Sequence, residues 1–357
     1  MPPRLVPRHL AIPAILLLAA GLPIAGCLAP DPGPAGITET VTGEWVRVYF
    51  TPPAGDSPGL DEELAAVIDQ AETSIDVAAY DLDLERVVEA LVQAQRDGVQ
   101  VRMVVESDNA DPEVLDPLRQ AGIAIYEDGR DEGLMHDKFV VVDGQWVWTG
   151  SWNLTYNGTY RNDNHVLLIA SLALAENYTR EFEEMLAGQF GPTSPATTPH
   201  RRVTITGEGT TRQTVIESYF APEDDAAAPI VAAIEGAQSR IRFMAFTITS
   251  DDITDALLAR AQDGVIVQGV VETRNVDQQG SDFDRLQTAL HDVLPDGNPY
   301  MMHHKAIIVD DETVIVGSYN FTRSAETSND ENVLIIHDPD IAALFVQEFG
   351  RVYEQAR

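Results

Sequence analysis

Short apolar runs alternate with amphipathic segments along most of the chain. The apolar runs predict strands at 46–50, 74–80, 99–105 and 123–126. The segments between them carry apolar residues at helical spacing and predict helices at 60–71, 84–95 and 112–120. Strands that are apolar throughout are typical of a sheet covered on both faces, so the alternation indicates an α/β fold.

This order of elements occurs twice. The first half continues with strands at 139–142, 146–148 and 165–169 and a helix at 172–186. In the second half, segments 215–220, 234–246 and 261–272 repeat 46–50, 68–80 and 95–106, and a helix at 341–354 closes the repeat. We therefore expect two similar α/β units that face one another across a pseudo-twofold axis.

One stretch recurs with fixed spacing in both halves. Both copies fit H-x-K-x4-D-x6-G-S-x-N and lie 167 residues apart. The specified side chains of the first copy are His136, Lys138, Asp143, Ser151 and Asn153. Those of the second copy are His303, Lys305, Asp310, Ser318 and Asn320. The chain has 23 Lys and Arg residues, and its two lysines are the ones in these motifs, which indicates that the motif requires a compact ammonium group.

The residue types of the motif suit phosphoryl transfer. On a strand, a His and a Lys two positions apart share one face, and the intervening Asp137 and His304 are expected to point away and to differ freely. The Gly-Ser-x-Asn segment adds a turn, a hydroxyl and an amide. With two copies facing each other, one His can attack phosphorus while the other protonates the leaving oxygen. The two lysines would supply the positive charge that a metal provides elsewhere, so no metal or cofactor is expected.

The two copies resemble the HKD motifs of the phospholipase D superfamily, and the similarity extends over about residues 45–355. The openings of both halves are most similar to small bacterial nuclease-like members and to the cardiolipin synthase and phosphatidylserine synthase group. The resemblance implies a duplicated α-β-α-β-α sandwich with the active site between its halves. It also implies a metal-independent mechanism through a phosphohistidine that water or another alcohol resolves.

One position differs between the halves. Thirteen residues beyond the motif serine, where the family commonly has a glutamate, the second half has Glu331 and the first half has Asn164. We expect Glu331 to pair with His303, which would favour the charged imidazole of a general acid. His136, without a glutamate partner, would then be the neutral nucleophile.

The N-terminus predicts export. Arginines precede an apolar run too short and too interrupted by proline for a confident membrane span, so residues 1–26 are expected to be a signal peptide. Cys27, the single cysteine, follows Ile-Ala-Gly and resembles the lipid-modified cysteine of a bacterial lipobox; the alternative is an ordinary buried cysteine. We expect a tether at 27–44, one half at 45–189, a linker at 190–213 and the other half at 214–357. The protein would then be a lipoprotein on the outer face of a membrane in the bacterial cell envelope.

The net charge restricts the class of substrate that we expect. At −34, the chain lacks the basic surface that captures nucleic acid, although acidity can also be an adaptation for solubility. We expect a phospholipase D-type hydrolase of glycerophospholipid headgroups. The alternatives are a nuclease, which the charge disfavours, a phosphatidyltransferase, and an inactive phosphate-binding module. No obligate partner is expected, because one chain carries both motifs.

Overall fold

The computed structural model describes residues 36–52, 54–55 and 57–357, and residues 36–357 belong to one compact unit. The predicted signal peptide, Cys27 and the first part of the predicted tether lie outside the described residues. Within the described residues, no helix combines the length and apolar character needed to cross a membrane.

The first half is built on a seven-stranded mixed sheet. Its strands are ordered β2-β8-β7-β6-β3-β4-β5. In chain order they are β2 (Val46–Thr51), β3 (Ser74–Ala79), β4 (Gln100–Val105), β5 (Ala124–Glu127), β6 (Lys138–Val142), β7 (Trp146–Gly150) and β8 (Asn164–Ala170). β3, β4 and β5 run parallel, and β6, β7, β8 and β2 pair in antiparallel fashion.

The second half repeats this topology within a nine-stranded sheet of order β1-β9-β10-β16-β15-β14-β11-β12-β13. The strands that match the first half are β10 (Gln213–Ala221), β11 (Arg240–Ala245), β12 (Ile266–Val271), β13 (Val293–Pro295), β14 (Lys305–Val309), β15 (Thr313–Gly317) and β16 (Glu331–His337). The additional strands are β1 (Ile37–Val41) and β9 (Arg202–Gly207).

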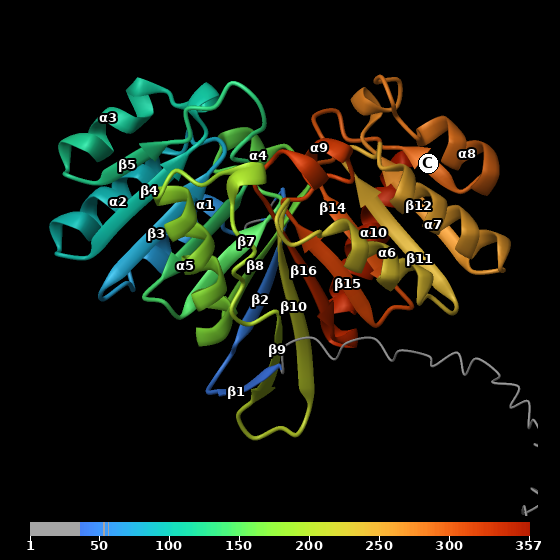
Figure 1. Cartoon of the computed structure of the whole chain (residues 1–357), viewed down its shortest axis with the longest axis horizontal. Helices are drawn as coiled ribbons and strands as arrows, with labels where there is room; N and C mark the ends of the chain where they lie inside the picture. The colour runs from blue at the N-terminus through green and yellow to red at the C-terminus, as the bar shows by residue number, and fades with distance from the viewer. Residues whose placement is uncertain (1–35, 53, 56) are drawn as a thin grey trace, which may run out of the picture. The chain divides into compact units, whose positions relative to one another are not determined.

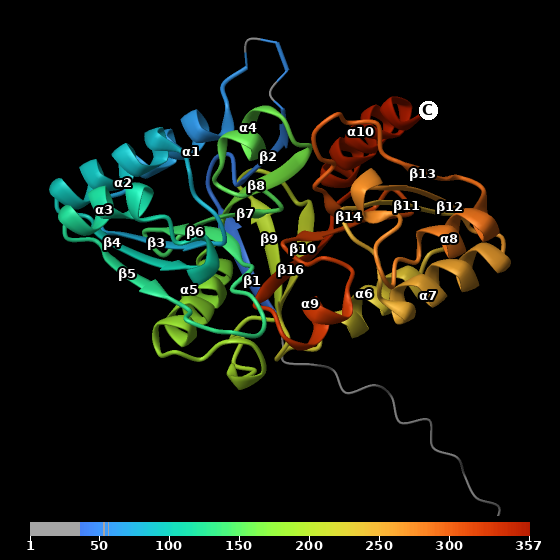
Figure 2. The same cartoon turned by 90° about the horizontal axis from the view of Figure 1, so that it is seen from above.

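Helices form three layers around the two sheets (Figures 1 and 2). One outer layer contains α1 (Leu60–Ile68), α2 (Glu85–Arg96) and α3 (Pro112–Gln120), and the other contains α6 (Ala227–Glu235), α7 (Asp251–Gln262) and α8 (Phe283–Leu290). Between the sheets lie α5 (Leu172–Leu186) and α10 (Pro339–Ala356). Buried apolar residues of both sheets and of these two helices form one central core, and each outer layer has a separate core. The expected duplicated α-β-α-β-α sandwich is confirmed.

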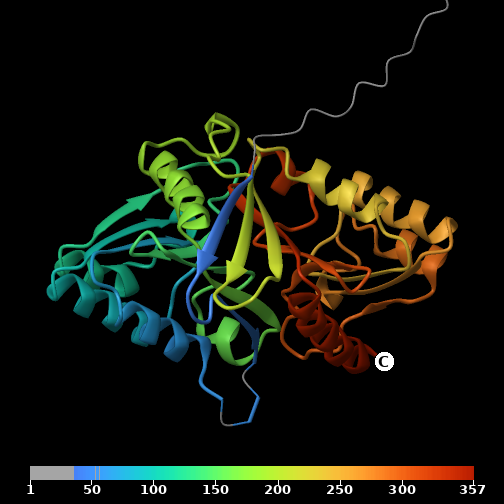
Figure 3. The same ribbon diagram turned by 90° about the horizontal axis from the view of Figure 1, so that it is seen from below.

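The two connecting segments contain more structure than the sequence predicted. β1 lies within the predicted tether and β9 within the predicted linker, and the two strands pair in parallel from Ile37 opposite Val203 to Val41 opposite Gly207. Figure 3 shows the blue β1 beside the yellow-green β9 and β10. Composition concealed these strands, because Thr and Pro are frequent in both segments and edge strands need few apolar residues.

A hairpin joins the two strands that the sequence predicted in the first motif. β6 and β7 are joined at Asp143 and Gly144, which both have positive φ, of 53° and 60°. Two successive residues in this region match the twist of the strands that they connect. The hairpin fixes the register between the strand that carries Lys138 and the strand that leads to Ser151.

Candidate active site

Backbone hydrogen bonds join the two halves at the start of each motif. Short parallel bridges join Met135 to Asp330 and Asp163 to Met302. The backbone N–H of His136 donates to the carbonyl oxygen of Asp330 at 3.0 Å, and that of His303 donates to Asp163 at 2.8 Å. The start of each motif is therefore held beside the residue that precedes β8 or β16 in the opposite half.

This crossing decides which side chain meets which histidine. Nδ1 of His136 lies 2.8 Å from Oε2 of Glu331. Nδ1 of His303 lies 2.9 Å from Oδ1 of Asn164 and 3.0 Å from the carbonyl oxygen of Ser151. The expected pairing of Glu331 with His303 is therefore wrong. That expectation placed the glutamate and the histidine in the same half. Each bridge instead brings the histidine of one half next to the residue that follows the bridge in the other half.

The two lysines lie beside the histidines and are also buried. Nζ of Lys138 donates to the carbonyl oxygen of His136 at 2.6 Å. Nζ of Lys305 donates to the carbonyl oxygen of His303 at 3.1 Å and lies 3.2 Å from Nε2 of that imidazole. In the part of the chain that the structure describes, neither ammonium group forms an ion pair with a carboxylate. No fixed carboxylate of the described residues therefore occupies either Nζ, and both can pair with an anion that enters the site.

Two aromatic rings complete the walls of the site and were missed by sequence reasoning. The ring of Tyr80 meets the ring of His136 edge-on at 4.7 Å, and that of Phe246 meets His303 at 4.6 Å. Nζ of Lys138 lies 4.7 Å from the centre of the Tyr80 ring. Nζ of Lys305 lies 4.8 Å from that of Phe246. The signal was present, because both rings end aligned strands of the repeat, but their role depends on the fold.

Burial and like charge govern the protonation of the site. Burial, followed by the ammonium groups of Lys138 and Lys305, lowers the pKa of His136 well below its ordinary value. Burial and the same ammonium groups also lower the pKa of His303. Burial lowers the pKa of Lys138 to about 8 and raises the pKa of Glu331 to about 7. Before substrate binds, neutral imidazoles are therefore favoured.

The glycine and serine of the motif position the partners of the histidines. Oγ of Ser151 donates to Oδ1 of Asn164 at 3.0 Å, and Oγ of Ser318 donates to Oε2 of Glu331 at 2.7 Å. A side chain at the preceding Gly150 would place its Cβ 2.2 Å from the carbonyl oxygen of His165, so only glycine permits this approach of β7 to β8. Both serines and Asn164, which the sequence predicted to support the site, lie in contact with the histidines or with their partners, and their role in a reaction stays a prediction.

The motif asparagines carry an unused amide group. Asn153 and Asn320 follow β7 and β15 and precede the short helices α4 (Tyr156–Tyr160) and α9 (Arg323–Thr327). Within the described residues, Oδ1 of each is buried without a hydrogen-bond partner. An amide turned by 180° presents NH₂ at the same point. A phosphate oxygen is the kind of acceptor that would satisfy it.

The motif aspartates do not belong to the site. Asp143 and Asp310 lie at the far end of β6 and β14, at the hairpin turns. The carboxylate of Asp143 accepts hydrogen bonds of 2.7 to 3.2 Å from the backbone N–H groups of Glu72, Thr73 and Ser74. Asp310 accepts equivalent bonds from residues 238–240. Their predicted support is thus structural, because each holds the loop that leads into β3 or β11.

The residues between the motif His and Lys are more constrained than expected. Asp137 and His304 are fully buried. Nδ2 of Asn332 donates to Oδ1 of Asp137 at 2.6 Å, and Nδ1 of His304 lies 3.2 Å from Nδ1 of His165. Both contacts cross between the halves. The prediction that these two positions differ freely is wrong, since each has a matched partner in the opposite half.

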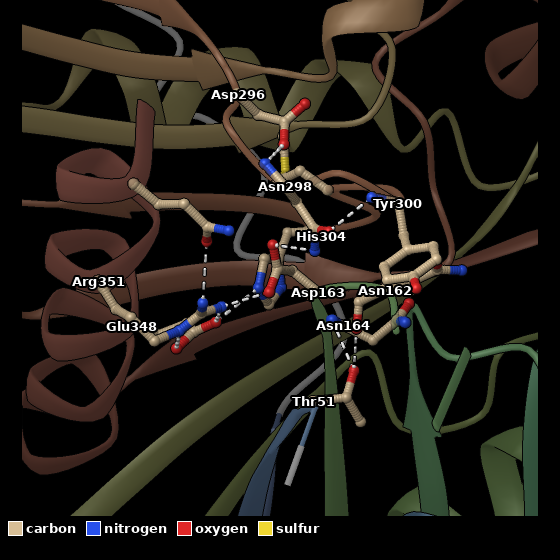
Figure 4. A network of polar contacts seen from close by, with 12 residues as sticks. Thr51, Asn162, Asp163, Asn164, Asp296, Asn298, Tyr300, His304, Glu348 and Arg351 are labelled. Carbon is tan, nitrogen blue, oxygen red and sulfur yellow. Dashed lines mark hydrogen bonds and ion pairs between the residues drawn. The ribbon is translucent and has the colours of Figure 1, made fainter. Parts of the chain in front are cut away.

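In the second half, the contact between His304 and His165 continues into a larger polar network (Figure 4). Nε2 of His304 lies 3.0 Å from Oε1 of Glu348, whose carboxylate also accepts from the guanidinium of Arg351 at 2.6 Å. Arg351 in turn donates to Asp163 at 2.5 Å. Although burial opposes it, these donors hold the pKa of Glu348 at about 2. The network ties α10 to the first half behind His303.

Two buried glutamates fix the approach to each motif. Oε2 of Glu106 accepts from the backbone N–H of Met135 at 2.7 Å, and Oε2 of Glu272 accepts from that of Met302 at 2.7 Å. Both were visible as aligned positions of the repeat, but sequence reasoning gave them no role. They determine where the backbone lies one residue before each histidine.

Comparison with known proteins agrees with this geometry. The family described as cardiolipin synthase, PLD-like domain, matches residues 64–186 and 230–353. The chain is similar to the phospholipase D of Rickettsia prowazekii, with 36% identity over 134 residues that cover 38% of this chain and 65% of that protein. It is also similar to the mitochondrial cardiolipin hydrolase of Chlamydomonas reinhardtii, with 39% identity over 30% of this chain and 49% of that protein. The chain thus spans about half to two thirds of the length of these relatives.

Among solved structures, the phosphatidylserine synthase of Haemophilus influenzae superimposes with a TM-score of 0.62 at 14% identity. The superposition covers 87% of this chain and 86% of that one. This likeness concerns the fold and extends over both halves. Since the family model matches each half separately, the chain belongs to the phospholipase D-like family and carries the domain of that family twice.

Proposed function

We propose that this protein is a phospholipase D-type phosphodiesterase that cleaves the headgroup from glycerophospholipids. The observation that carries the proposal is the convergence of His136, Lys138, His303 and Lys305 at the boundary between the halves. Within the described residues, neither lysine forms an ion pair with a carboxylate, so the two imidazoles and two ammonium groups suit a phosphodiester anion.

The roles of the two histidines follow from their partners. The bond to Glu331 favours a proton on Nδ1 of His136, which leaves the lone pair of Nε2 to attack phosphorus, and the carboxylate stabilises the positive charge that then develops. His303 has only neutral acceptors at Nδ1, so its imidazolium is a stronger acid. The nucleophile assigned to His136 therefore stands as a proposal, for a reason opposite to that given by the sequence.

The proposed reaction has two balanced steps. Once the phosphodiester anion is bound, its negative charge favours the imidazolium form of His303. Nε2 of His136 then forms a bond to phosphorus, the bond to the headgroup oxygen breaks, and that oxygen takes the Nε2 proton of His303. Water then gives a proton to His303 and attacks phosphorus, and the P–N bond electrons return to His136. Lys138 and Lys305 balance the charge on the non-bridging oxygens throughout, with the amides of Asn153 and Asn320 as further donors. An alcohol in place of water would give transfer.

Lipid is favoured over nucleic acid by charge and by the neighbouring surface. The chain has a net charge of −34, which repels a polyanion. Tyr156 and Tyr300, which are 52% and 45% exposed, flank the guanidinium of Arg161 at 5.2 and 5.1 Å. Exposed tyrosines beside a cation suit the boundary between lipid headgroups and water. The names of the Rickettsia and Chlamydomonas relatives point to the same substrate class.

The test is an assay of the purified full-length protein on vesicles of phosphatidylcholine, phosphatidylglycerol or cardiolipin, and on plasmid DNA. We expect headgroup release that His136→Ala abolishes, and no DNA cleavage. Faster cleavage of DNA than of every lipid would overturn the lipid assignment. Binding of inorganic phosphate without turnover of any substrate would instead support a binding module. Added ethanol distinguishes transfer from hydrolysis through the appearance of a phosphatidylethanol product.

Location remains part of the proposal. We propose that the protein is exported and anchored through a lipid on Cys27, because the sequence before that residue is typical of a lipobox. Release of the protein from membranes by Cys27→Ser, measured by cell fractionation, would support the anchor. Membrane association unchanged in that variant would contradict it.

A further inference from the structure

A cluster of carboxylates lies behind the first motif and takes no part in the proposed reaction. Glu181 and Glu184 lie one turn apart on α5, and Glu223 follows β10 in the second half. One carboxylate oxygen from each lies within 4.8 Å of the others. Glu181 and Glu184 are buried, and Glu223 is partly buried.

Among the residues that the structure describes, two of the three carboxylates find no counterion. Glu184 accepts from Thr197 and lies 3.4 Å from the guanidinium of Arg180. Within the described residues, Oε1 of Glu181 and both carboxylate oxygens of Glu223 are buried and have no hydrogen-bond partner. Glu181 is only 3% exposed, so solvent does not compensate for the missing partner.

The second half shows which side chains lie at the equivalent positions. Glu181 and Glu348 are separated by the same 167 residues as the motif histidines, and so are Asp137 and His304, and Glu184 and Arg351. In the second half, Glu348 lies between the imidazole of His304 and the guanidinium of Arg351. In the first half, both of these positions carry carboxylates. A positive charge is therefore missing beside Glu181.

We propose that Glu181, Glu184 and Glu223 bind a divalent cation that takes the place of the guanidinium of Arg351. A site of carboxylate oxygens alone suits a hard cation such as Ca²⁺ rather than a metal that prefers imidazole or thiolate. The cation would join α5 of the first half to the loop after β10 in the second.

Electrostatics supports the same site. Burial, followed by the charge of Glu223, raises the pKa of Glu181 well above its ordinary value. Burial raises the pKa of Glu223 to about 8. Two such carboxylates need either a shared proton or a cation near neutral pH, and these alternatives respond differently to calcium.

The site is structural and independent of the proposed function, so its test uses binding and stability. Full-length protein is stripped of metal with EDTA, dialysed and titrated with Ca²⁺ alone at pH 7.5 by calorimetry. We expect one site, and an increase in Tm of about 5 °C when calcium reaches roughly 100 times its Kd. Glu181→Gln should lose both the heat of binding and the increase in Tm.

Two further variants use the symmetry of the molecule. Glu184→Arg supplies the guanidinium that the second half contains, so it should raise the Tm of the stripped protein and abolish the response to calcium. Glu348→Gln is the matched control: it should lower the Tm of the stripped protein yet leave the calcium response intact.

Two outcomes would overturn the proposal. The first is an increase in Tm with calcium that persists in both Glu181→Gln and Glu184→Arg. The second is the behaviour of a shared proton. A raised folded-state pKa gives stability that is present at low pH and lost as pH rises, so Tm would fall as pH rises through about 8 whether calcium is present or absent.

Discussion

The two halves have the same backbone and the same motif, but they surround their histidines differently. His136 receives the carboxylate of Glu331, whereas His303 receives the amide of Asn164 and a carbonyl oxygen. Because these contacts cross the boundary, each half determines the chemistry of the other. The difference shows how a duplicated site can divide two roles without altering the motif itself.

The residues between the motif His and Lys also differ between the halves. The first motif rests on an aspartate paired with an amide, and the second on two stacked imidazoles whose rings lie 5.4 Å apart. Behind them, the first half gathers carboxylates and the second alternates Glu348 with Arg351. Acidic side chains therefore accumulate behind His136, whereas behind His303 they are paired with basic ones.

The largest expected effect on turnover comes from replacing the two histidines. His136→Ala should abolish turnover and also the covalent intermediate, because the nucleophile is lost. His303→Ala should slow turnover roughly 10²- to 10⁴-fold with a natural headgroup but should still form the intermediate from a substrate whose leaving group needs no proton. Mass spectrometry of acid-free digests locates the phosphoryl adduct. Adduct on His303 would reverse the assignment.

The next effect concerns the partners of the histidines. Glu331→Gln should lower kcat roughly 10- to 100-fold, in line with about 1.5–3 kcal/mol for a hydrogen bond to a charged group. In the wild type, the pKa of Glu331 is raised to about 7 and its ionised form is required, so kcat/KM should fall as pH drops below about 7. Glu331→Gln should lose this acid limb.

The reciprocal change is Asn164→Asp, which gives His303 a carboxylate. This variant should raise the pKa of His303 and move the alkaline limb of the profile to higher pH. A pH profile measured on one lipid substrate checks both variants. An acid limb that persists in Glu331→Gln would show that another group controls it.

A smaller effect concerns the buried contacts of Asp137 and His304, and it is measured as a change in stability. Asn332→Leu removes the donor to the buried Asp137 and should reduce the free energy of unfolding by about 1–3 kcal/mol. The pKa of Asp137 is raised to about 7, so the loss should grow as pH rises above 7 and the carboxylate ionises. His165→Leu should cost less, because His304 keeps Glu348. Urea denaturation measures both, and equal losses would refute the distinction.

The smallest effect concerns one hydroxyl. Tyr80→Phe gives the first half the ring that Phe246 provides in the second, and kcat should change by no more than about threefold, because the contacts to His136 and Lys138 use the ring. Tyr80→Ala is the control and should reduce kcat more. A large loss in Tyr80→Phe would assign the hydroxyl a direct role and separate the halves further.

Much of this molecule was predictable from the sequence because its signals are local or repeated. Alternation of apolar runs with amphipathic segments placed the strands and helices, since burial of alternating elements needs that pattern. The fixed spacing of His, Lys, Ser and Asn in two copies identified the residues that meet at His136 and His303. Only elements with weak apolar signals, such as β1 and β9, were missed.

The pairing of side chains across the halves was decided by tertiary structure. The sequence contains Glu331, Asn164, Asp137 and His304, but nothing in their spacing states that the bridge from Met135 to Asp330 brings Glu331 to His136. Hydrogen bonds between residues almost 200 positions apart depend on how two folded units dock. For the same reason, the uncompensated charge beside Glu181 becomes visible only when the two halves are compared in space.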